Sequence, residues 1–138
     1  MQVYPLTLAG HHVRLEPLST AHAESLIAAA ADGELWNSTV TLVPSRENIG
    51  EYIDAALQAQ AGGRELPFVI IRKSSDMVVG TTRFYDIERN DRRVAIGYTW
   101  LARSAHTRWP MWYGAYDSQR NWTMPHDTCL SALMTSCC

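Results

Sequence analysis

The sequence predicts an α+β domain in which one strand and two helices precede an antiparallel meander of three strands. Two observations support this prediction. Residues 19–33 and 45–61 carry apolar side chains at three- and four-residue spacing, as in helices that bury one face. Residues 67–101 contain three runs rich in β-branched and aromatic residues, separated by polar segments, as in strands joined by turns. Strands that follow helices in this way indicate the α+β class.

The first strand is predicted over residues 12–18, where polar and apolar side chains alternate until Pro17 ends the pattern. Ser19 or Thr20 then caps a helix, because a hydroxyl oxygen can accept a hydrogen bond from the free N–H groups of the first turn. The apolar face of this helix is Leu26, Ile27 and Ala30, and Gly33 is its stop.

The second helix is predicted to follow Pro44, with Ser45 as its N-cap and Glu47 in the first turn, where a negative charge favours the helix dipole. Gly62 and Gly63 end it. Its apolar face consists of residues one turn apart, namely Ile49, Tyr52, Ile53, Ala56 and Leu57.

The meander comes next. Strands are predicted over Pro67–Arg72 and Met77–Tyr85, and the four polar residues Lys73–Asp76 between them indicate an antiparallel hairpin. The charged segment Asp86–Arg93 is predicted to be a solvated loop. Val94–Leu101 is the third strand of the meander.

The tail of the chain differs from the rest. Trp109, Trp112 and Trp122 and all three cysteines fall in it, and residues 104–128 show no sustained period of 3.6 or 2. We therefore expect a domain over residues 1–103 and an irregular tail over residues 104–138.

Composition excludes several classes of protein. A chain of 138 residues suits one domain, and a net charge of -2 gives no basic field for nucleic acid. No apolar run approaches the roughly 20 residues that span a bilayer, and the first residues do not resemble a secretory signal. We expect a cytoplasmic protein with no membrane partner.

The three cysteines lie within the last ten residues, an arrangement that indicates free thiols rather than a disulfide framework. No metal site is predicted, because the spacing of the histidines and cysteines does not match paired zinc ligands. The residues concerned are His11, His12, His126, Cys129, Cys137 and Cys138.

Particular stretches resemble the GNAT superfamily of N-acetyltransferases, in the branch that contains the acetyltransferases of ribosomal proteins. The "G-x-x-V-R-L-E-P-L" opening at residues 10–18 and the "I-G-Y-x-W-L" strand at residues 96–101 form the more specific pair. His22 and residues 52–57, 67–70 and 79–83 also match. The resemblance covers residues 6–102.

The resemblance implies transfer of an acetyl group from acetyl-CoA to a primary amine. In such enzymes the strand matching residues 96–101 splays from a neighbour and holds the pantetheine arm through its backbone, which here would place Tyr98, Thr99, Trp100 and Leu101 beside acetyl-CoA. The alternative is that these are ordinary strand residues.

Three further residues are candidates for the acceptor side of the same cleft. Trp36 occupies the loop between the helices, and Arg83 and Tyr85 lie on the neighbouring strand. The alternative for these residues is a capping aromatic and a solvated strand face. Glu16 and Glu34 are candidate proton acceptors by residue type only.

Residues 102–110 depart from the family pattern. Family members follow the strand with a Gly-rich turn and a helix whose N-terminus holds the CoA pyrophosphate. Here the stretch has no glycine, and Pro110 interrupts a helix. A truncated or frameshifted tail would produce this pattern, and it predicts an impaired or inactive enzyme. The alternative function is a non-catalytic remnant or weak protein-interaction module, which could self-associate through the exposed edge of residues 96–101.

Overall fold

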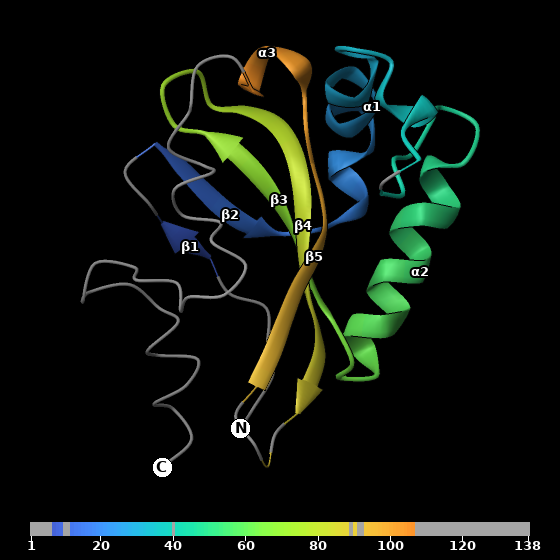
Figure 1. Ribbon diagram of the computed structural model, residues 1–138, viewed down its shortest axis with the longest axis vertical. Helices are drawn as coiled ribbons and strands as arrows, with labels where there is room; N and C mark the ends of the chain where they lie inside the picture. The colour runs from blue at the N-terminus through green and yellow to red at the C-terminus, as the bar shows by residue number, and fades with distance from the viewer. Residues whose placement is uncertain (1–6, 10–11, 40, 89, 91–92, 107–138) are drawn as a thin grey trace.

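The computed structural model describes residues 7–9, 12–39, 41–88, 90 and 93–106 (Figure 1). In chain order the elements are β1 (Leu8–Ala9), β2 (Val13–Pro17), the 3₁₀ turn η1 (Thr20–His22), α1 (Ala23–Ala31), the 3₁₀ turn η2 (Leu35–Asn37), α2 (Ile49–Ala61), β3 (Leu66–Arg72), β4 (Met77–Glu88), β5 (Arg93–Leu101) and α3 (Arg103–His106). This order confirms the predicted class and adds β1 at the front. The predicted tail lies outside the described residues from residue 107 onward.

The five described strands form one antiparallel sheet in the order β1-β2-β3-β4-β5. The strand before the helices pairs with the first strand of the meander, for example Leu15 with Ile70. Helices α1 and α2 both lie on one side of this sheet (Figure 1). After the two helices the chain therefore returns to the sheet, where β3 pairs with β2. Strands β4 and β5 then extend the sheet from β3.

The core lies between these helices and the sheet and continues across β3. Six of the seven residues of β3 are buried, so both faces of this strand are removed from water. Phe68 packs edge-to-face on Phe84 of β4, with ring centroids 5.3 Å apart. From the helices the buried residues are Leu26, Ile27, Ala29 and Ala30 of α1 and Ile49, Tyr52, Ile53 and Ala56 of α2.

The predicted cap at Ser19 is found, but it opens the 3₁₀ turn η1, and α1 follows this turn from Ala23. The backbone N–H of Ser19 donates a hydrogen bond to Nδ1 of His22 at 3.1 Å, which closes a capping box around η1. Beyond α1 the chain turns at Gly33, whose φ is +101°. Glycine adopts this backbone conformation freely, whereas other residues adopt it only with strain. The predicted stop at Gly33 is confirmed.

The predicted start of the second helix is wrong by three residues. Ser45 does not cap α2 but opens a turn, in which its N–H donates to Oδ1 of Asn48 at 2.7 Å. The helix begins at Ile49, so Glu47 precedes it and Glu51 holds the first-turn position. A polar side chain can close a local turn as readily as cap a helix. The predicted end is confirmed, since the N–H of Gly62 donates to the carbonyl of Gln58 at 3.0 Å.

The prediction of a solvated loop over Asp86–Arg93 is wrong at both of its ends, while residues 89, 91 and 92 lie outside the described residues. Strand β4 continues to Glu88 and β5 begins at Arg93. Along residues 85–88 half-buried and exposed positions alternate, which is the pattern of a strand with one solvated face. The charges occupy that solvated face, so the charged composition does not exclude a strand. A bulge at Asp86, whose φ is +49°, accommodates the register shift.

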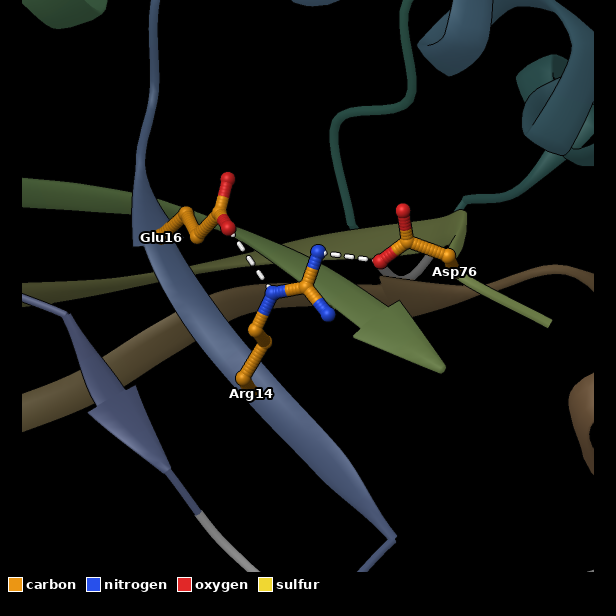
Figure 2. Close-up of polar contacts among 3 residues, drawn as sticks. All are labelled: Arg14, Glu16 and Asp76. Carbon is orange, nitrogen blue, oxygen red and sulfur yellow. Dashed lines mark hydrogen bonds and ion pairs between the residues drawn. The ribbon is translucent and has the colours of Figure 1, made fainter. Parts of the chain in front are cut away.

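Arg14 ties β2 to the turn between β3 and β4 (Figure 2). Its Nε donates to Oε1 of Glu16 at 2.8 Å, and its terminal Nη2 donates to Oδ1 of Asp76 in the turn. The hydrogen bond to Glu16 and then that to Asp76 raise the pKa of Arg14 above its ordinary value. The predicted turn at Lys73–Asp76 is confirmed and is held against the sheet by this contact.

Candidate functional site

Strand β5 contains a β-bulge at Tyr98 and Thr99. These two residues lie opposite the single residue Thr82 of β4. The flanking register pairs are Thr81 with Trp100 and Arg83 with Gly97. A bulge bends its strand and re-aims the side chains around it, and bulges concentrate beside active sites.

The backbone of Tyr98 is strained. Its φ is +51°, in the left-handed region that bulky L-residues avoid. Such a conformation costs about 1–3 kcal/mol and persists only where surrounding contacts hold it. Strain of this kind clusters at functional sites, which makes the bulge the first candidate in the described residues.

Aromatic contacts hold the ring of Tyr98. Its ring meets that of Tyr85 edge-to-face, with centroids 5.5 Å apart. Gly97 makes room for this arrangement, because a Cβ at that position would lie 2.7 Å from Cε1 of Tyr85. The residue Tyr98 nevertheless remains 41% exposed, so the bulge is open to solvent at this aromatic residue.

Arg83 lies beneath the same ring. Its guanidinium carbon is 4.8 Å from the ring centroid of Tyr98 and 5.0 Å from that of Tyr52 on α2. Nη1 of Arg83 donates to Oε2 of Glu65 at 3.1 Å. Arg83 is only 7% exposed, and a buried cation needs such a partner to avoid a large desolvation cost.

Buried hydrogen bonds fasten the residues around the bulge. Nε1–H of Trp100 donates to the hydroxyl of Tyr52 at 3.4 Å, and that hydroxyl is 3.1 Å from Oγ1 of Thr81. The hydroxyls of Thr82 and Thr99 are 2.8 Å apart, which joins β4 and β5 across the bulge itself. The bulge is therefore connected to α2 and to β4 by polar contacts as well as by packing.

Among the described strands, β5 pairs with β4 alone and forms the edge of the sheet. Backbone N–H and C=O groups along a strand edge form hydrogen bonds readily with an extended, amide-containing ligand. The strained bulge and the strand edge thus coincide at Tyr98–Leu101.

The chain enters α3 immediately beyond β5. The N–H of Ala102 donates to the carbonyl of Val79 at 2.7 Å, which continues the sheet by one bond. The N–H of Arg103 donates to the carbonyl of Asp32 at 2.9 Å, and the N–H and hydroxyl of Ser104 both donate to the Asp32 carboxylate. Although residues 102–106 contain no glycine, a helical turn forms here.

Gly33 permits the close approach of α1 and α3. A Cβ at Gly33 would lie 2.9 Å from Cβ of Arg103. The hydrogen bond from the Ser104 hydroxyl, above all, lowers the pKa of Asp32 from its ordinary value of 3.8. The carboxylate of Asp32 thus already accepts hydrogen bonds at the start of α3.

We expect Asp32→Ala to lower the free energy of unfolding by about 1 kcal/mol at neutral pH, the usual effect of losing a carboxylate that caps backbone N–H groups. Because the folded-state pKa of Asp32 is lowered, its contribution is present above pH 3.8 and is lost as the pH falls through the folded value. Urea unfolding of both proteins at several pH values measures this. A difference that persists unchanged into acid would contradict the assignment.

The structure brings some of the predicted site residues together. Tyr98 contacts both Arg83 and Tyr85, and Thr99 completes the bulge. Trp100 and Leu101 are buried, so their side chains are not exposed to solvent. Trp36 lies apart from these contacts on η2 and is 40% exposed.

The candidate proton acceptors are separated from one another. Glu16 is paired with Arg14, and Glu34 is exposed in the connection after α1. Sequence reasoning missed Glu65 and the polar role of Tyr52. Tyr52 matches the apolar period of α2, which conceals its hydroxyl, and Glu65 has no signal beyond being an acid next to a buried strand.

The described residues contain no group of three or more His, Cys, Asp or Glu side chains that could hold a metal ion. His11, His126 and the three cysteines lie outside them. No described helix is long and apolar enough to cross a membrane.

Residues 12–114 match the family model of the acetyltransferase (GNAT) domain. The chain belongs to the GNAT acetyltransferase family. The match reaches beyond residue 102, where the resemblance read from the sequence ends, and the boundary placed at residue 103 stays a prediction. No curated protein sequence matches this member of the family.

Solved GNAT proteins share its fold. A GCN5-related N-acetyltransferase from Brucella melitensis is 24% identical, with a TM-score of 0.58, over 73% of this chain and 47% of that one. The ribosomal α-N-protein acetyltransferase RimL, in its apo form, is 18% identical, with a TM-score of 0.65, over 96% of this chain and 64% of that one. RimL in complex with coenzyme A is 17% identical, with a TM-score of 0.62, over 95% and 67%. This chain thus spans about half to two thirds of their length.

The described residues fit one part of acetyl-CoA. The edge of β5 at the bulge offers backbone donors and acceptors of the kind that an amide-rich pantetheine arm uses. At the start of α3 the carboxylate of Asp32 accepts the hydrogen bond from the N–H of Ser104. Because this negative charge already occupies the position, binding of a second anion beside it is unfavourable.

Proposed function

We propose that this GNAT protein is an N-acetyltransferase that transfers an acetyl group from acetyl-CoA to a primary amine, with the pantetheine arm along the edge of β5 at Tyr98–Leu101. The observation that carries the proposal is the bulge, where a non-glycine residue at φ +51° lies on the edge strand of a GNAT fold. A regularly paired strand would not contain this strained backbone conformation, and such strain is typical of functional sites.

In this proposal the chain's own residues orient the reactants. Bound acetyl-CoA would supply the acyl group of its thioester. The amine nitrogen would form a C–N bond to the acyl carbon and the C–S bond would break. The proton lost by the amine would pass through a base or a water to the departing thiolate, so that CoA leaves as the free thiol. The backbone of the bulge holds the arm, and an N–H directed at the acyl oxygen would stabilise the developing negative charge. Tyr85 and Trp36 are proposed for the acceptor side, because both carry aromatic surface. The acceptor itself is not determined by the fold.

We also propose a cytoplasmic location, because the odd number and the clustering of the cysteines indicate free thiols. Self-association through β5 is the competing use of the same edge.

Isothermal titration of the purified chain with acetyl-CoA tests the proposal, and two variants of Tyr98 sharpen it. Tyr98→Gly removes the ring but accepts a positive φ, whereas Tyr98→Val removes the ring and strongly disfavours that φ. We expect micromolar, saturable binding by the wild type and a change of about threefold or less in Tyr98→Gly. We expect binding at least about tenfold weaker in Tyr98→Val, or roughly 1.4 kcal/mol.

Met77→Val is the matched control, because it places the same β-branched residue at an exposed and unstrained position of β4. Equal binding by Tyr98→Gly and Tyr98→Val would show that the bulge is not the site. No binding by a folded wild type would overturn the proposal and support the non-catalytic alternative, and light scattering would then report self-association. Release of free CoA thiol with a panel of primary amines measures transfer.

A further inference from the structure

Arg83 is enclosed in a way that neither ordinary sheet packing nor substrate contact explains. Its guanidinium lies between the ring of Tyr52 and the ring of Tyr98, and Glu65 accepts a hydrogen bond from its Nη1 at 3.1 Å. With 7% of the residue exposed, the charge is removed from solvent on both flanks. An arginine meant to bind an acceptor directly would present its donors to solvent instead.

The contacts around Arg83 form a closed circuit that spans the bulge. Trp100, two residues beyond Tyr98 on β5, donates its indole N–H to Tyr52 on α2. Tyr52 stacks on Arg83, and Arg83 stacks in turn on Tyr98, which returns the circuit to β5. The two ends of the strained segment are therefore connected through α2 and β4, independently of the backbone between them.

These contacts hold the side chain of Tyr98 in place, which its strained backbone requires. A non-glycine residue at positive φ relaxes unless its side chain is held in place, and the face of a guanidinium attracts an aromatic ring more strongly when water is excluded. Glu65 compensates the buried charge and keeps the planar group oriented.

We propose that Arg83 is a positioning residue that holds Tyr98, and with it the left-handed bulge of β5, in the conformation used to bind acetyl-CoA. This inference rests on the proposed function for its consequence in binding, but the conformational part concerns the free protein alone. In this proposal Arg83 positions Tyr98 and does not contact the acceptor amine directly.

A double-mutant cycle between Arg83 and Tyr98 tests the inference through acetyl-CoA affinity. We expect Arg83→Met to weaken binding about tenfold in the wild-type background, because the methionine fills the space between the rings without a charge. In the Tyr98→Gly background the same substitution should change the affinity by less than about twofold, since glycine adopts positive φ without help. Equal weakening in both backgrounds would show a merely structural role and overturn the inference.

A second readout needs no ligand and separates failure of this inference from failure of the proposed function. At positive φ the amide and α protons of a residue lie close together, so Tyr98 should give a strong intraresidue cross-relaxation signal in NMR spectra of the free protein. We expect Arg83→Met to lose this signal while the spectrum of α1 stays unchanged. A signal that persists overturns the inference, whether or not the wild type binds acetyl-CoA.

Two more substitutions complete the design. Arg83→Lys keeps the charge but lacks the planar group, and we expect it to recover only part of the affinity lost in Arg83→Met. Arg14→Met is the matched control, because Arg14 is also an ion-paired arginine of this sheet but lies on β2, next to Glu16 and Asp76 (Figure 2). It should leave both readouts at wild-type values, and a loss there as large as in Arg83→Met would also overturn the inference.

Discussion

Gly80→Ala should lower the free energy of unfolding by about 3 kcal/mol or more. A Cβ at Gly80 would lie 2.0 Å from the carbonyl oxygen of Trp100 and 3.0 Å from its carbonyl carbon. Both atoms belong to the backbone of the neighbouring strand, so no side chain can rotate away to make room. Gly80 is also paired with Ile70 on its other side, which prevents β4 from moving back.

Urea unfolding followed by circular dichroism measures this effect. Gly50→Ala is the matched control, because it occupies the first turn of α2 and, apart from its chain neighbours and the nearby backbone of the helix itself, nothing lies within 4 Å of the position of its Cβ. There we expect a gain of about 0.5–1 kcal/mol, since alanine favours a helix over glycine. Equal effects at the two glycines would show that the close approach of β4 to β5 at Gly80 is absent in solution.

Phe68→Ala should be the most damaging truncation in the core, with a loss of about 3–5 kcal/mol. The side chain is 1% exposed, comes from the strand that is buried on both faces and packs on Phe84. Its removal leaves a cavity that the surrounding β-strands cannot close without breaking their hydrogen bonds. The unfolding midpoint in urea should therefore fall without a change in the slope of the transition.

A double-mutant cycle with Phe84→Ala isolates the edge-to-face contact. We expect a coupling of about 0.5–1.5 kcal/mol between the two rings. Met77→Ala, at an exposed position of β4, should change the stability by less than about 0.5 kcal/mol and serves as the control. Additive losses at Phe68 and Phe84 would rule out the direct ring contact.

Local patterns predicted most of the secondary structure because the information lies within a few residues. The spacing of Ile49, Tyr52, Ile53 and Ala56 identified α2, and the polar residues Lys73–Asp76 identified the hairpin turn. The same reasoning was wrong at Ser45 and at both ends of the segment Asp86–Arg93. In both places polar residues suit more than one local structure, and the choice depends on which surfaces the rest of the chain covers.

The candidate site was predicted in part. The resemblance to GNAT proteins predicted that residues 98–101 lie beside acetyl-CoA, and the bulge lies within this segment. Its conformation could not be read from the sequence, because Tyr98 and Thr99 are favourable residues for a regular strand and carry no sign of a positive φ. Arg83 could not be placed either, since an arginine on a strand is expected to face water.

Short-range periodicity and motifs were enough to predict the α+β class, the helix faces, the meander and the likeness to GNAT proteins. Three features depend instead on the folded chain: the pairing of β2 with β3, the extra residue that makes the bulge, and the enclosure of Arg83 by Tyr52, Glu65 and Tyr98. These features join residues far apart in the chain. Register and burial arise from the fit of whole surfaces, and that fit exists only once the chain has folded.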